Sequence, residues 1–93
     1  MFKKRRGIHI SYNKQGLIYF VCINLASLPV DLQKRVVKKI AHLCSTICED
    51  DNEYAALYEV LTNDRKSVFA IAAENYISEK RLYRLRKMFY ENW

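Results

Sequence analysis

Glycine and proline are scarce in this 93-residue chain, which holds two glycines and one proline. Folds with many turns depend on both residues, so their scarcity excludes a loop-rich or many-stranded β architecture and favours long elements. No apolar run in the sequence approaches the roughly 18–20 residues needed to cross a bilayer. We therefore expect a single domain over residues 1–93 that does not bind a membrane.

Cysteine is also sparse, and the three cysteines include no CxxC pair. This pattern supports neither a disulfide framework nor a zinc ribbon and fits a reducing cytoplasm. Cys44 and Cys48 share a helical face, but His42 lies off it, so we expect buried thiols rather than a metal site. The sequence has no nucleophile elbow, phosphate-binding glycine loop or clustered histidine and carboxylates. We expect no enzyme activity, no metal and no cofactor.

Positive charge dominates the chain, because 16 Lys and Arg residues against 10 Asp and Glu give a net charge of +6. Such a balance favours an acidic partner, either nucleic acid or an anionic membrane. The charges are segregated, since residues 1–6 form a basic tail while residues 49–64 contain acids and no base. The tail can serve as an arm that grips phosphates or only as a solubilising extension.

Residues 7–24 are predicted to form a β-hairpin. The first segment, residues 7–12, alternates apolar and polar side chains, and residues 17–23 are apolar on both faces. Both segments are rich in β-branched and aromatic residues, and Gly16 ends the turn between them. The expected fold class is therefore α+β, mainly α, with an N-terminal β-hairpin followed by about four helices.

A long helix is predicted over residues 28–49, with Ser27 and Pro29 suited to its start. Its apolar stripe recurs at three- and four-residue steps and comprises Leu32, Val36, Ile40, Leu43, Cys44 and Ile47. On the other side lie basic residues that either extend a phosphate footprint or are simply solvated: Arg35, Lys38, Lys39 and His42. A helical unit over residues 52–91 follows.

The last third of the chain has a helix-turn-helix layout. Ser67 can cap a helix over residues 68–75, residues 76–78 can turn the chain, and Ser78 can cap a final helix to about Glu91. The spacing of Ser67, Ile71, Ala72, Ile77, Ser78 and Leu82 resembles helix-turn-helix units of sigma-factor-like regulators of bacteria and phages. Less specifically, the layout from residues 15–20 through residues 56–62 to residues 83–90 is similar to small regulators carried on prophages and conjugative elements of Gram-positive bacteria.

The resemblance to helix-turn-helix units covers residues 67–90 and implies roles for several residues. Ala72 would let the two helices approach, the three larger aliphatic side chains would form a small core, and Ser78 would start the recognition helix. The sequence departs from the family at Asn75 and Tyr76, where the family usually has an apolar residue and a glycine. That departure predicts a different turn.

The final helix suggests the function. Lys80, Arg84 and Lys87 lie opposite an apolar stripe of Leu82, Leu85, Met88 and Phe89. We expect a sequence-directed regulator of a phage or mobile element that binds double-stranded DNA, although such a basic face can also be merely solvated. The predicted site comprises Ser67 and Ser78 on phosphates and Lys80, Arg81, Tyr83, Arg84 and Lys87 on base edges.

A homodimer is expected because one small module reads few base pairs, with the hairpin edge or the aromatic end Phe89, Tyr90 and Trp93 at its interface. The alternative is a protein-binding module, such as an inhibitor or adaptor of a host transcription protein, that uses the same two surfaces. The exposure of the basic residues on the final helix distinguishes these two hypotheses. DNA binding requires open basic residues on the final helix, whereas the alternative requires them paired with Asp50, Asp51 or Glu59.

Overall fold

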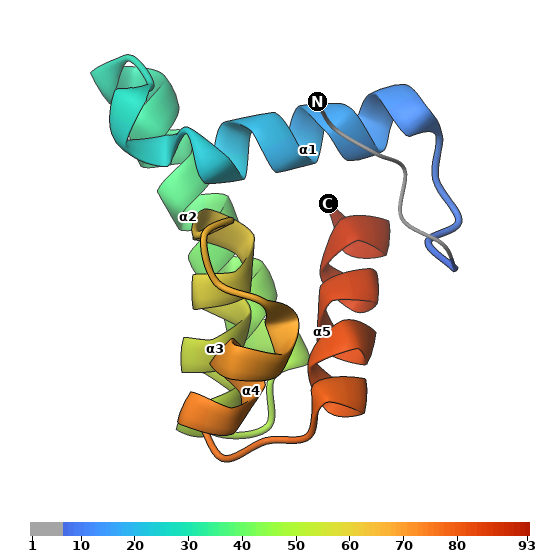
Figure 1. The fold of residues 1–93 in the computed structure, drawn as a ribbon. Coiled ribbons are helices and arrows are strands. Elements are labelled where there is room, and N and C mark those ends of the chain that lie inside the picture. The colour runs from blue at the N-terminus through green and yellow to red at the C-terminus, as the bar shows by residue number, and fades with distance from the viewer. Residues whose placement is uncertain (1–6) are drawn as a thin grey trace.

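The computed structural model describes residues 7–93, which form five α-helices and one short 3-10 helix and contain no strand (Figure 1). The elements in chain order are α1 (Tyr12–Ile23), η1 (Leu25–Ser27), α2 (Val30–Ile47), α3 (Asp51–Thr62), α4 (Val68–Glu74) and α5 (Glu79–Asn92). Helix α1 crosses one end of the bundle near the C-terminus, and the turn between α4 and α5 lies at the opposite end (Figure 1). The chain is a small all-helical domain, so the expected α+β class is wrong.

The predicted hairpin over residues 7–24 is absent, and most of this segment is helix α1. The hydroxyl of Ser11 caps the helix by accepting a hydrogen bond from the backbone amide of Lys14 at 3.2 Å. Ile18, Val21 and Cys22 are buried at helical spacing, whereas Leu17 and Phe20 face outward. Residues 17–23 are apolar on both faces, but only one face packs on the core and the other is exposed to solvent. The segment is therefore not a buried strand.

Gln15 is the buried polar residue that ties the N-terminal segment to α1. Its side-chain amide donates to the carbonyl oxygens of Ile8 at 3.3 Å and Ile10 at 3.4 Å. The backbone amide of His9 donates to Glu91 of α5 at 3.0 Å. Residues 8–10 are thus held against two helices, whereas the basic tail expected at residues 1–6 lies outside the described part of the chain.

Helix α2 begins at Val30 with Pro29 as its N-cap, so the predicted start at residue 28 and the capping role of Ser27 are wrong. Ser27 instead ends η1. The predicted apolar stripe is buried at Val36, Ile40, Leu43, Cys44 and Ile47. Leu32 is the exception because its position near the start of the helix leaves it exposed.

Two hydrophobic clusters form the interior. The larger one joins buried side chains of α1, α2, α3 and α5, and the smaller one joins α3, α4 and α5. Cys22 and Cys44 belong to the larger cluster, where burial raises the pKa of each thiol to about 12. The expectation of buried thiols is confirmed for these two residues, while Cys48 is half-buried. Among residues 7–93 no group of three or more potential ligand side chains could hold a metal ion.

None of the helices described here is long and apolar enough to cross a bilayer.

Candidate nucleic-acid interface

Helices α4 and α5 both begin at the serines predicted to cap them. The hydroxyl of Ser67 accepts a hydrogen bond from the amide of Ala70 at 3.1 Å, and that of Ser78 accepts from the amide of Arg81 at 3.0 Å. Both capping predictions are confirmed. Each hydroxyl keeps its hydrogen for donation to a further acceptor. The two serines lie apart, because the whole of α4 separates Ser67 from the turn that leads to Ser78.

The turn between α4 and α5 is a Schellman motif centred on Tyr76. The amide of Ile77 donates to the carbonyl of Ala72 at 3.1 Å, and the amide of Tyr76 donates to Ala73 at 3.3 Å. Tyr76 has a φ of 59°, a left-handed conformation that glycine adopts with little strain. The tyrosine therefore takes a backbone conformation suited to the glycine usual in the family it resembles, and its side chain is 87% exposed.

The smaller hydrophobic cluster packs α4 against α5. Ile71, Ala72 and Leu82 are fully buried there, and Ile77 packs against them. Ile71, Ile77 and Leu82 were predicted to form the small core, and this prediction is confirmed. Ala56 of α3 is a fourth buried member, which the sequence spacing of residues 67–90 could not reveal.

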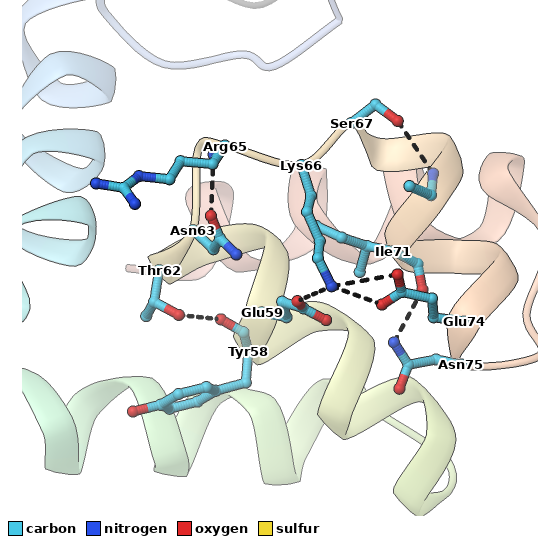
Figure 2. Close-up of polar contacts among 11 residues, drawn as sticks. Tyr58, Glu59, Thr62, Asn63, Arg65, Lys66, Ser67, Ile71, Glu74 and Asn75 are labelled. Atoms are coloured by element: carbon cyan, nitrogen blue, oxygen red, sulfur yellow. Dashed lines mark hydrogen bonds and ion pairs between the residues drawn. The ribbon is translucent and has the colours of Figure 1, made fainter.

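Lys66 holds α4 to α3 from the solvent side (Figure 2). Its ammonium group lies 3.3 Å from a carboxylate oxygen of Glu59 in α3 and 2.8 Å from one of Glu74 in α4. The connection before α4 is shaped locally by Asn63, whose side-chain oxygen accepts from the amide of Arg65 at 2.9 Å (Figure 2). Because Lys66 is exposed, these ion pairs add little to the stability of the domain.

The outer face of α5 is basic and open. Lys80 and Arg84 are exposed and Lys87 is half-buried, opposite the buried Leu82 and Leu85. Steps of four and three residues place the three cations along one side of the helix. No ion pair joins any of them to an acidic side chain in the described part of the chain.

Among the residues predicted to contact base edges, Arg81 differs because its guanidinium forms an ion pair with another helix. It forms a fork with the carboxylate of Glu53, with Nε to Oε2 at 2.8 Å and Nη2 to Oε1 at 3.1 Å. Nη2 also lies 3.6 Å from a carboxylate oxygen of Glu49. The hydrogen bond from Arg81 lowers the pKa of the buried Glu53 carboxyl. The side chain therefore joins α5 to α3 and is not on the outer face.

Tyr83 lies beside the basic face and stacks with a residue that the sequence reasoning missed. The guanidinium carbon of Arg86 is 5.1 Å from the centre of the Tyr83 ring, a cation–π contact. The i and i+3 spacing of the two residues on one helix could have indicated this pair. Glu53 had no such signal, because 28 positions separate it from Arg81.

The surfaces predicted for the homodimer interface and for the alternative protein-binding function are not available as expected. The hairpin is absent, and Phe89 and Tyr90 of the aromatic end are buried in the larger cluster. Trp93 is half-buried, and the ammonium of Lys39 lies 4.3 Å from the centre of its ring. The predicted aromatic interface is thus mostly part of the core.

Comparisons of the chain with protein-family models, curated proteins and solved structures gave no match. They identify no family, and what is established is a small domain of five α-helices in residues 7–93.

Proposed function

We propose that this chain binds double-stranded DNA through the outer face of α5. The observation that carries the proposal is the row of Lys80, Arg84 and Lys87, which have no acidic partner within residues 7–93. This matches the arrangement required of a DNA-binding helix and not that required of the alternative, in which the same cations are paired with acids. The resemblance of residues 67–90 to helix-turn-helix regulators further supports a role in transcriptional control of a phage or mobile element.

In the proposed mechanism α5 enters the major groove, which accommodates an α-helix. Arg84 and the two lysines are long enough to reach guanine edges or phosphates, and Tyr83 can donate its hydroxyl to a phosphate. Ser67 and Ser78 can donate their hydroxyl hydrogens in the same way. Arg81 supports the site indirectly, because its fork with Glu53 fixes the first turn of α5 against α3.

The side of α5 that faces α3 is unsuited to DNA. Glu49 is 81% exposed beside Arg81, and Asp50 and Asp51 follow it on the surface. These carboxylates repel phosphates within about one Debye length, roughly 8–10 Å at moderate salt. The duplex is therefore expected to contact the outer face of α5 from Lys80 to Lys87 and to stay clear of the start of α3.

The decisive experiment measures binding of the full chain to a fluorescent random-sequence duplex at several salt concentrations. The test variant replaces Lys80, Arg84 and Lys87 with alanine. The control replaces Lys34, Arg35 and Lys38 of α2, which are exposed and also lack an acidic partner in the described range. Both variants lose three positive charges, so only the location of the charges differs.

Binding is expected to weaken steeply with salt, since each neutralised phosphate releases counterions. The α5 variant should lose most of the affinity and reduce the salt slope by about three, while the α2 variant should stay close to the parent. Equal losses in the two variants would show that net charge alone attracts the DNA. Absence of binding at about 50 mM salt would contradict the proposal.

A further inference from the structure

The outward side of α2 carries a second basic surface. Lys34, Arg35 and Lys38 are exposed there, and we call these three residues the α2 face. No ion pair joins any of them to an acidic side chain within residues 7–93. The only acidic residue of α2 is Asp31, near its start. Four Lys and Arg residues against this one acid leave the helix with a net charge of +3.

We infer that the α2 face binds the phosphate backbone of a second DNA duplex, so that one molecule bridges two duplexes. This inference rests on the proposed binding of a first duplex by α5. A duplex carries one negative charge per about 1.7 Å of its axis, so cations on an exposed helix find phosphates without a shaped pocket. Each phosphate neutralised by Lys or Arg releases counterions, which favours binding although no base is contacted.

The α2 face and the outer face of α5 point in different directions. Lys39 marks the side of α2 that is turned toward α5, because its ammonium lies 4.3 Å from the centre of the Trp93 ring, directly after α5. At about 100° per residue, Lys38 lies about 100° and Lys34 about 140° around α2 from Lys39. Arg84 is exposed on α5, away from the side that packs with α2 in the larger cluster. A straight duplex along the outer face of α5 therefore leaves the α2 face open.

Other acidic partners fit the α2 face less well. A helix that binds an anionic membrane inserts an apolar face, and the apolar stripe of α2 is already buried in the core. Protein interfaces are enriched in aromatic anchors, and α2 contains no Phe, Tyr or Trp. A phosphate backbone requires only accessible cations at short intervals, and these are what the α2 face offers.

A two-duplex capture assay on the full chain tests the inference. Beads carry one biotinylated duplex, the protein is bound to it at about 50 mM salt, and a fluorescent second duplex is added after unbound protein is washed away. Protein retained on the beads reports the first duplex, and fluorescence per retained protein reports the second. Capture of the second duplex should fall roughly 40-fold between about 50 and 200 mM salt, because three phosphate contacts give a logarithmic slope near about −2.7.

Two sets of variants locate the second site. Replacing all three residues of the α2 face with alanine should leave retention on the bead duplex close to that of the parent and reduce capture of the second duplex at least about tenfold. Lys38→Glu should reduce capture similarly. Lys14→Glu is its matched control, because Lys14 is also exposed on a helix and its replacement changes the net charge equally, but it lies on α1. Circular dichroism establishes that each variant is folded.

The outcomes separate this inference from the proposed function. A parent that is retained by the bead duplex but captures no second duplex would overturn the inference alone, whereas a parent that is not retained at all would overturn the proposed function and the inference with it. Undiminished capture by the triple-alanine variant would also overturn the inference, because the bridge would then arise from self-association or from other residues. The same holds if phosphatidylserine vesicles bind through the α2 face and the second duplex does not.

Discussion

Arg81 and Glu53 form a two-pronged ion pair that joins the first turn of α5 to the first turn of α3. The same carboxylate accepts a hydrogen bond from the backbone amide of Glu49 at 3.0 Å. Asp50 completes the start of α3 by accepting from the amide of Glu53 at 2.8 Å. The buried carboxylate of Glu53 thus joins the segment before its own helix to the start of the proposed recognition helix.

Replacing Glu53 with glutamine should destabilise the domain by about 1–3 kcal/mol, because Arg81 loses the closer of its two charged partners while remaining largely buried. Urea unfolding followed by circular dichroism measures the change. Glu49→Gln is the matched control, since Glu49 is exposed and its loss should cost less than about 1 kcal/mol. Equal losses in the two variants would show that the fork itself adds nothing.

The ion pair also predicts how stability depends on pH. The hydrogen bond from Arg81 places the pKa of Glu53 below the ~4.3 of an unperturbed Glu carboxyl in the unfolded chain. Its contribution is therefore fully present above about pH 5 and is lost as pH falls through the folded-state pKa. The difference in unfolding free energy between the parent and Glu53→Gln should stay constant between about pH 6 and pH 5 and shrink as the pH is lowered from about 5 to 3. A difference independent of pH in urea titrations would contradict this assignment.

Tyr76→Gly should stabilise the domain by about 0.5–1 kcal/mol, because it removes the strain of a left-handed tyrosine and loses no buried surface. Thermal unfolding measures the effect. Tyr76→Ala is the control, since alanine keeps the Cβ atom that causes the strain and should leave stability nearly unchanged. Stabilisation by alanine as large as that by glycine would place the effect in the exposed ring instead of the backbone.

Arg84→Ala should change the unfolding free energy by less than about 0.5 kcal/mol, since the side chain is exposed on a helix. Its affinity for a duplex selected from a random pool should fall by about 1–3 kcal/mol. Arg84→Lys keeps the charge but lacks the fork that matches a guanine edge, so it should retain non-specific binding and lose preference for the selected duplex. Unchanged preference in Arg84→Lys would indicate a phosphate contact.

The C-terminal half of the fold could be predicted because its signals are local. Ser67 and Ser78 precede helices at the spacing that capping requires, and both cap as expected. The apolar stripe of α5 has a clear helical period, so Leu82 and Leu85 were correctly placed in the interior. Helix starts and amphipathic faces depend on neighbouring residues, and a single sequence contains them.

The N-terminal segment could not be predicted in the same way. Residues 17–23 are too short and too uniformly apolar for periodicity to distinguish a strand from a helix, and their β-branched and aromatic content favoured a strand. Tertiary contacts decide the outcome, with Ile18 and Cys22 in the core and Gln15 bonded to Ile8 and Ile10. The engagement of Arg81 was missed for the same reason, because its partner lies in another helix.

The smaller hydrophobic cluster holds α4 to the rest of the domain through few buried side chains. Only Ile71 and Ala72 of this seven-residue helix are fully buried, and Lys66 adds no more than exposed ion pairs. Detaching α4 should therefore require less free energy than unfolding the whole domain, so its amides should exchange with deuterium before those of α2 and α5.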